Sequence, residues 1–326
     1  MRFALEDLFA DVPAEQVAEA RAFYRARVAG RGPASFDELE AVRARRSAPP
    51  AADPPAAEEM AEAAGARVPV RVFLPSGGAP RGVHLDIHGG GFYMDTAAHG
   101  DIRNRALAEE LNSVVVSVDY RLAPEHPWPA APDDCETAAL WLAEQAGGRF
   151  GTSRLTIGGS SAGATLALAT LLRLRDRRSR DASSSPDEAV PASRYADAVS
   201  RFAGAALQFG TYDLSALTPA GRRIADEYFI EAYVGHVPAR DRTLPDISPL
   251  YADLTGLPPV LLVVGAEDVL LEDNLTLAGR LSAAGNDVEL HLYPAVPHGF
   301  TGHPTALAST ALAGIGSWLR ERLSRP

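Results

Sequence analysis

The feature that most constrains the fold of this chain is an alternation of short apolar runs with longer helical patterns. The apolar runs, each of a length typical of a buried strand, lie at 83–87, 114–118, 155–157, 205–209, 260–264 and 288–292. The helical patterns lie at 101–111, 132–146, 161–175, 272–284 and 305–323. Neighbouring parallel strands require a crossover, which is usually a helix. The alternation therefore predicts an α/β fold, with a mostly parallel central sheet, helices on both faces and right-handed connections.

Several segments depart from this alternation. Residues 1 to about 48 are predicted as helical, and one helix begins at Ser35–Glu38, a pattern typical of a capping box. Residues 48–55 look like a Pro/Ala linker, and residues 177–197 like a surface loop rich in Ser, Arg and Asp. Residues 213–251 contain helical pieces without a strand pattern, which suits an insertion over a site. Residues 68–74 alternate as a half-exposed antiparallel strand does.

The charge and the cysteine content exclude several classes of protein. With 31 basic and 42 acidic residues, the net charge of −11 argues against nucleic acid or an anionic membrane as a partner. No apolar stretch approaches the ~20 residues that span a bilayer, and the first residues carry acids without an apolar signal core. A single cysteine, Cys135, rules out an intrachain disulfide and fits a reducing compartment. We therefore expect a cytoplasmic protein without membrane insertion.

Ser161 lies in a pattern typical of a catalytic nucleophile. The segment Gly159-Ser160-Ser161-Ala162-Gly163 connects a predicted strand to a predicted helix. A sharp strand-to-helix turn exposes the serine hydroxyl, and small flanking residues allow the backbone to turn so tightly. The start of the helix also directs free N–H groups toward the reacting centre. A serine used in this way needs a base, an acid and donors for an oxyanion.

Candidates for the base and the acid follow Ser161 in the chain. His298 lies in the loop after the last predicted strand, and Asp268 follows the strand 260–264 at its carboxyl end, where open α/β sheets assemble their sites. Glu267 remains an alternative to Asp268. Other acids and histidines of this region fit less well, because they fall in a helix start, within a strand, in the insertion or beyond the loop: Glu272, Asp273, His291, His236 and His303.

A glycine run supplies candidate oxyanion donors. His88-Gly89-Gly90-Gly91-Phe92 directly follows the predicted strand 83–87, and its glycines expose backbone N–H groups that no side chain obstructs. His84, Asp86 and His88 share one face of that strand and resemble a metal site. Glycines follow them, however, and no further cluster of ligands does. No metal is therefore expected.

Five motifs occur together in the order of one known family: His88–Phe92, Asp119–Ala130, the turn at Ser161, Asp268-Val269-Leu270 and His298-Gly299-Phe300. From about residue 68 to its end, the chain resembles the bacterial hormone-sensitive-lipase-like carboxylesterases of the α/β-hydrolase fold. It departs from their usual pattern at two positions. Ser160 stands where these proteins most often have Asp, and Ala164 stands in place of a second glycine. Neither change removes a catalytic atom.

The resemblance implies the following roles. Ser161 would be the nucleophile, His298 the general base and then acid, and Asp268 the residue that orients the imidazole. Backbone N–H groups of Gly89, Gly90 and Ala162 would form the oxyanion hole, with no metal or organic cofactor. Residues 51–326 would form the catalytic domain, and residues 1–50 and 213–251 would form a helical cap over it.

These observations predict a serine hydrolase that acts on small-molecule esters with small to medium acyl groups through an acyl-enzyme. Amide hydrolysis, deacetylation or acyl transfer would use the same triad. A catalytically silent receptor is a third reading, but such proteins typically lose the histidine. Candidate substrate contacts are Phe92, Tyr93 and Tyr212. By analogy with relatives, the strand 288–292 is a candidate sheet edge for a homodimer.

Overall fold

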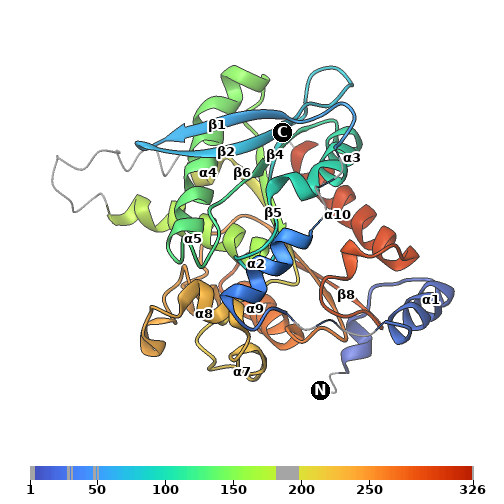
Figure 1. Cartoon of the computed structure of the whole chain (residues 1–326). Coiled ribbons are helices and arrows are strands. Elements are labelled where there is room, and N and C mark those ends of the chain that lie inside the picture. Colours follow the sequence, from blue (N-terminus) through green and yellow to red (C-terminus); the bar gives the residue numbers. More distant parts are fainter. Residues whose placement is uncertain are drawn as a thin grey trace.

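The computed structural model describes residues 4–27, 30, 32–46, 49, 51–180 and 198–324. These residues form an eight-stranded sheet in the order β1-β2-β4-β3-β5-β6-β7-β8 (Figure 1). The strands are β1 (Ala57–Ala63), β2 (Ala66–Phe73), β3 (Val83–Ile87), β4 (Val114–Val118), β5 (Leu155–Ser160), β6 (Phe202–Gln208), β7 (Val260–Gly265) and β8 (Val288–Tyr293). All pairs from β4 to β8 are parallel, while β1 and β2 are antiparallel. The predicted α/β fold with a mostly parallel sheet is confirmed.

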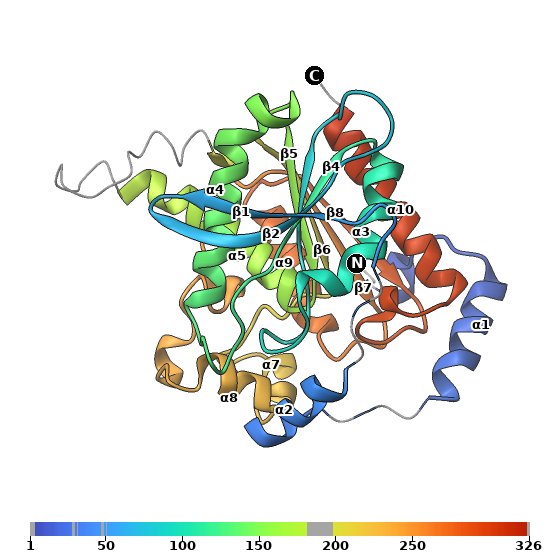
Figure 2. The ribbon, with the colours of Figure 1, turned by 45° about the horizontal axis from the view of Figure 1, so that its top comes forward.

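Helices cover both faces of this sheet. On one face lie α4 (Ala130–Phe150) and α5 (Ala162–Arg180), and on the other α3 (Asp101–Leu111) and α10 (Ala306–Ser324) (Figures 1 and 2). Because both faces are covered, β3, β4 and β7 are buried at every residue, which explains their continuous apolar sequences. Further helices in the described part of the chain are α1 (Ala14–Arg25), α2 (Phe36–Arg45), α7 (Pro219–Ile224), α8 (Tyr228–Val234) and α9 (Leu271–Ala283). Short 3-10 turns are η1 (Leu5–Leu8), η2 (Ala97–Gly100), η3 (Ala239–Asp241), η4 (Pro249–Tyr251) and η5 (Phe300–Gly302).

The first strand, β1, has no strand pattern in the sequence. Its Ala- and Glu-rich sequence favours helix by intrinsic propensity. It is nevertheless paired along its whole length with β2, through a tight turn at Ala64 and Gly65 that both have positive φ (51° and 77°). Its alternate residues pack toward α4. Tertiary pairing therefore overrides local preference here.

Two sequence-based predictions need correction. Helix α5 continues to Arg180, so the loop predicted for 177–197 is wrong for 177–180, and its remaining residues lie outside the described part. Ser35 does cap α2, accepting the Glu38 N–H at 3.3 Å, but the Glu38 carboxylate accepts from the N–H of Ala34 (2.8 Å) rather than from Ser35. The predicted capping box is therefore only half formed.

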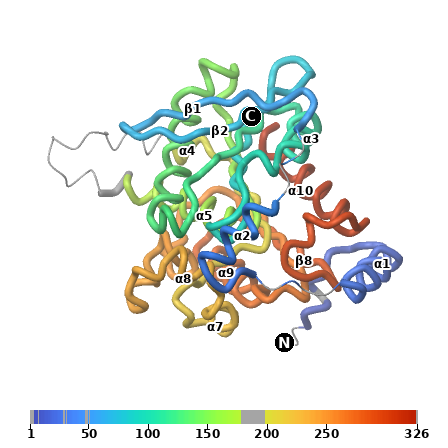
Figure 3. The backbone as a smooth tube through the Cα atoms, in the orientation of Figure 1, coloured from blue at the N-terminus to red at the C-terminus, as the bar shows by residue number. Residues whose placement is uncertain are grey.

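The two N-terminal helices lie on different parts of the molecule. Helix α1 packs beside α10, where Tyr24 Oη is 3.0 Å from His303 Nδ1 (Figure 3). Helix α2 lies instead near α8, where Arg43 donates to the carbonyl of Tyr93 (Figure 2). Residues 213–251, all described, contain helices and no strand, as predicted.

Strand β8 lies at the edge of the sheet, as its sequence predicts. The N-terminal segment covers part of this edge, because the N–H of Ala10 donates to the carbonyl of Leu292 at 2.8 Å. Among the described helices, none combines the length and apolar character that a bilayer crossing requires.

Candidate active site

The turn between β5 and α5 holds Ser161 in a strained conformation. Ser161 has φ = 53°, and its N–H donates to the carbonyl of Gln208 at 2.9 Å. A Cβ at Gly159 or Gly163 would collide with the carbonyl oxygen of Ile87, at the end of β3. Glycine is therefore required on both sides of the serine, since the elbow packs directly on the neighbouring strand.

Ser161, His298 and Asp268 form one hydrogen-bonded chain. His298 Nε2 lies 2.9 Å from Ser161 Oγ, and its Nδ1 lies 3.1 and 3.0 Å from the two oxygens of Asp268. The Asp268 side chain is fully buried, and the Leu270 N–H donates to its Oδ1 at 2.8 Å. Because a carboxylate only accepts, Nδ1 carries the proton and Nε2 is free to accept from the serine hydroxyl.

The rival acids and histidines are held elsewhere. Glu267 is exposed, and in the first turn of α9 Asp273 is buried while the neighbouring Glu272 is partly buried. His291 lies beside Glu289, and His303 is bonded to Tyr24. His236 lies against the ring of Trp128. Of the histidines described, His298 alone is hydrogen-bonded to Ser161.

The glycine run after β3 presents unpaired donors. Within the described residues, the N–H groups of Gly89 and Gly90 have no acceptor, and Ala162 is the first residue of α5, where helix N–H groups are free. Gly90 has φ = 106°, and a Cβ there would collide with the carbonyl of Met94. The loop therefore requires glycine, and its free N–H groups are available to a developing oxyanion.

Two buried aromatic side chains hold this loop, and no sequence motif predicted a role in the site for either. The hydroxyl of Tyr120 donates to the carbonyls of His88 (3.0 Å) and Gly89 (3.2 Å), and His88 Nδ1 lies 2.8 Å from the Gly89 carbonyl. The rings of Tyr120 and His88 stack with their centroids 4.1 Å apart. Burial lowers the pKa of His88 to about 4, so this imidazole is neutral at pH 7. A signal was present in the sequence, because Tyr120 lies just after the strand that pairs with β3.

The end of β6 joins the serine turn to the histidine loop. Gln208 accepts from Ser161 through its carbonyl and from the Thr301 hydroxyl, at 2.9 Å, through Oε1. The ring of the next residue, Phe209, lies against that of His298 with centroids 5.1 Å apart. The sequence carried no signal for these contacts beyond the position of both residues at a strand end.

The three candidate substrate contacts differ in how deeply they are buried. Phe92 is fully buried and stacks on Tyr233 at 3.9 Å, and Tyr212 is fully buried as well. In this conformation neither presents a surface to a ligand. Burial also raises the pKa of the Tyr212 hydroxyl. Tyr93 retains slight exposure, and its ring lies near that of Phe229.

The three side chains that resembled a metal site have other partners. His84 Nδ1 lies 3.0 Å from Thr156 Oγ1, and Asp86 accepts from Arg103 and Asn104 at 2.9 Å. Throughout the described ranges, no group of three or more His, Cys, Asp or Glu side chains could hold a metal ion.

Comparisons with known proteins place the chain in a family. Residues 84–302, more than half of the chain, match a family model described as the alpha/beta hydrolase fold. The chain is 31% identical to the carboxylic ester hydrolase LipN of Mycobacterium tuberculosis over 276 residues (79% of this chain and 68% of the relative). It is 32% identical to the carboxylesterase NlhH of the same species over 252 residues (76% and 75%).

Solved structures agree with these sequence comparisons. The esterase LipW from Mycobacterium marinum superposes with a TM-score of 0.73 at 27% identity, covering 95% of this chain and 98% of its own. A structure of EstE5 soaked with p-nitrophenyl butyrate also gives 0.73, at 25% identity, covering 95% and 99%. The family match, the sheet order and the strand–elbow–helix unit all agree, and this chain belongs to the α/β-hydrolase fold family.

Proposed function

We propose that this protein is a serine carboxylesterase that hydrolyses small-molecule esters with small to medium acyl groups. The observation that carries this proposal is the continuous chain of hydrogen bonds from Ser161 through His298 to Asp268. The relatives named above as carboxylic ester hydrolases and esterases support the same reaction.

In the proposed mechanism, Ser161 Oγ attacks the ester carbonyl carbon while His298 Nε2 removes its proton. The carbonyl oxygen becomes negative and accepts from the N–H groups of Gly89, Gly90 and Ala162, each worth about 3 kcal/mol. The imidazolium then protonates the leaving alcohol, which leaves an acyl-enzyme. Water, deprotonated by His298, attacks this ester and releases the acid. Asp268 stabilises the charged imidazole throughout.

The proposal includes a helical cap formed by residues 1–50 and 213–251, with residues 51–326 as the catalytic domain. Two contacts support it for α2 and α8. Arg43 donates to the carbonyl of Tyr93, close to the glycine loop, and the Tyr93 ring lies near those of Tyr228 and Phe229. Since α1 packs on α10, the N-terminal contribution to the cap comes from α2.

The remaining proposals concern location and assembly. A single cysteine, Cys135, buried in α4, supports a cytoplasmic location, because it forms no intrachain disulfide. The edge strand β8 supports a homodimer, in which the two copies would pair along the part of the edge that Ala10 leaves uncovered. Sedimentation tests the dimer.

The decisive experiment measures hydrolysis of p-nitrophenyl acetate, butyrate and octanoate by the wild type and by two adjacent serine variants. Ser161→Ala should lower kcat by about 10⁴-fold or more, as removal of a catalytic serine does. Ser160→Ala is the matched control, because Ser160 Oγ makes no hydrogen bond in the described structure. A fluorophosphonate should label the wild type and the control but not Ser161→Ala. Ordinary turnover by Ser161→Ala would overturn the assignment, and acyl transfer to an added alcohol in preference to water would change the reaction class.

A further inference from the structure

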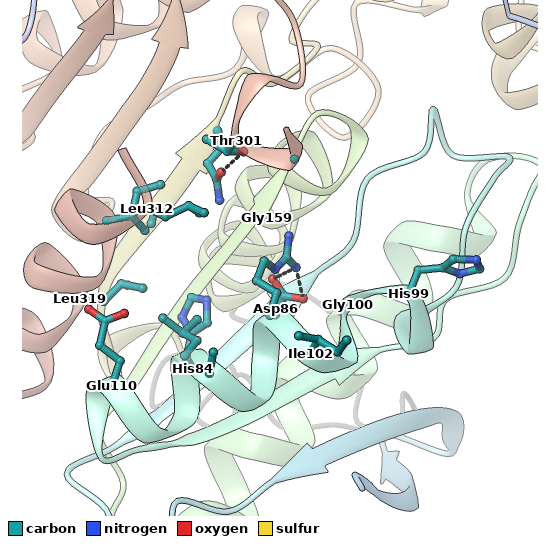
Figure 4. A pocket seen from close by; sticks show the side chains of 17 residues that line it. His84, Asp86, His99, Gly100, Ile102, Glu110, Gly159, Thr301, Leu312 and Leu319 are labelled. Carbon is teal, nitrogen blue, oxygen red and sulfur yellow. Dashed lines mark hydrogen bonds and ion pairs between the residues drawn. The ribbon is translucent and has the colours of Figure 1, made fainter. Parts of the chain in front are cut away.

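A cavity lies between α3 and α10, apart from the triad. Its volume is about 620 Å³, within the range of small-molecule sites (Figure 4). None of the three triad residues lines it. Aliphatic side chains from α3 and α10 form much of its wall: Ile102, Leu107, Leu312, Ile315 and Leu319. Such a wall suits an aliphatic chain.

Polar side chains gather at one part of this cavity. Asp86 lies there with its partner Arg103, and Thr301 lies across from them with Gln208 as its partner (Figure 4). The Asp86 carboxylate is already occupied at both oxygens, since Oδ2 accepts from Arg103, from Asn104 at 2.9 Å and from Ser117 at 3.2 Å, and Oδ1 accepts from Arg103. It therefore has little capacity left to bind a donor from a ligand.

Two hydrogen-bond donors that line the cavity, in contrast, have no acceptor among the described residues. The Arg103 guanidinium holds Asp86 through Nη2, and within the described residues its Nη1 has no acceptor. Gln208 Oε1 is occupied by Thr301, and no described residue accepts from Gln208 Nε2. His84, which also lines the cavity, is neutral at pH 7, because burial lowers its pKa to about 4. The polar end therefore presents unused N–H groups of an arginine and of an amide to a ligand that accepts hydrogen bonds.

The charges at the far end favour the same orientation. Glu110 lies beside Leu319, away from Thr301, and is paired with Arg320 at 3.0 Å (Figure 4). Glu110 lines the cavity, whereas its partner Arg320 does not, so a ligand carboxylate at that end would meet a negative charge. At the other end it would meet the unused N–H groups of Arg103 and Gln208. Arginine binds carboxylates through paired N–H groups, and it can share them between two acids.

We propose that this cavity is a second, non-catalytic site for a medium-chain aliphatic carboxylate. The carboxylate accepts from Arg103 Nη1 and Gln208 Nε2, and the chain lies between α3 and α10 against Leu312 and Ile315. The binding does not depend on the proposed esterase activity, although the ligand belongs to the class of acids which that activity would release. Gln208 also accepts the Ser161 N–H, so the site borders the catalytic serine's own support.

The test is calorimetric titration of Ser161→Ala protein, which removes turnover, with octanoate and with octanamide as its uncharged analogue. Octanoate should bind saturably at one site, and octanamide at least 10-fold more weakly. Ala106→Trp, at an exposed position of α3 that lines the cavity, should abolish binding. Ala313→Trp is the matched control, because Ala313 is exposed on α10 and does not line the cavity.

A second variant tests the proposal if Ala106→Trp disturbs folding. Leu312→Glu places a negative charge against the aliphatic wall and should weaken octanoate at least 10-fold. Circular dichroism verifies the fold of each variant. Equal affinities for octanoate and octanamide, or octanoate binding that neither Ala106→Trp nor Leu312→Glu changes, would overturn the proposal. Because Ser161→Ala is used throughout, these outcomes are independent of the outcome for the proposed esterase.

Discussion

Tyr120→Phe removes one hydroxyl that holds the glycine loop, from which the proposed oxyanion donors come, and leaves the ring in place. That hydroxyl donates to the carbonyls of His88 and Gly89, while the aromatic stack with the His88 ring needs no oxygen. The His88 carbonyl shares a planar peptide unit with the Gly89 N–H, and the Gly89 carbonyl shares one with the Gly90 N–H. Holding these carbonyls therefore fixes the direction of the two free N–H groups. The variant therefore tests whether the direction of the donors, and not only their presence, limits the rate.

The expected losses of stability and of kcat depend on which hydrogen bonds to the two carbonyls remain in the variant. Both carbonyls lose the Tyr120 hydroxyl, but the Gly89 carbonyl keeps His88 Nδ1 at 2.8 Å. Only the buried His88 carbonyl is therefore left without a side-chain donor. A buried acceptor without a partner costs about 1–3 kcal/mol, and we expect a loss of ~1–2 kcal/mol in the free energy of unfolding. Complete loss of one oxyanion donor costs about 3 kcal/mol, so misdirection should cost less and kcat should fall by ~10- to 50-fold.

The assay is steady-state hydrolysis of p-nitrophenyl butyrate at pH 7.5, with urea denaturation of the same samples. We expect kcat to fall while KM changes by less than ~3-fold, because the donors act mainly on the transition state. Tyr293→Phe is the matched control, since the buried Tyr293 hydroxyl makes no hydrogen bond to the described residues. An unchanged kcat in a variant destabilised as expected would refute the reasoning, as would a rise in KM alone.

Three further predictions follow. Gly163→Ala should destabilise the fold and lower kcat at least 10-fold, because its Cβ would collide with the Ile87 carbonyl; full activity in the p-nitrophenyl ester assay would contradict the elbow geometry. Asp268→Asn should lower kcat by about 10⁴-fold at pH 7 with intact folding by circular dichroism, since an amide can hold His298 in the wrong tautomer. Burial, reinforced by Asp213, raises the pKa of Asp273 from 3.8 to about 6, so stability falls as pH rises through this range. Urea denaturation of Asp273→Asn should show an advantage over wild type of up to ~3 kcal/mol at pH 7.5 that shrinks toward pH 4; a pH-independent difference would disprove the shift.

Most of the fold could be predicted from the sequence, because the signals for its strands and for the turn at Ser161 are local. Strands such as β3 and β7 are buried on both faces, so every residue in them is under the same pressure to be apolar and the run is visible by itself. The elbow at Ser161 is equally local, since glycines at 159 and 163 are required within one turn. The chain order of Ser161, Asp268 and His298 could also be read directly.

Contacts between distant segments could not be read in the same way. The sequence left Glu267 open beside Asp268. Only the tertiary structure separates them, because Asp268 is buried and hydrogen-bonded to His298, whereas Glu267 is exposed. Strand β1 has helix-favouring residues and becomes a strand because β2 is available to pair with it. The docking of α1 on α10 rests on pairs such as Tyr24 with His303, which lie 279 positions apart.

The sequence by itself determined the layered α/β architecture, the elbow and the residue types from which the candidate site is built. The tertiary structure alone decided how that site is held: Tyr120 on the glycine loop, Gln208 between the serine turn and the histidine loop, and a cavity between α3 and α10. The physical reason is that periodicity and turn chemistry act between neighbours in the chain. Support for a site comes from close packing, which brings together side chains from strands and helices that no local pattern connects.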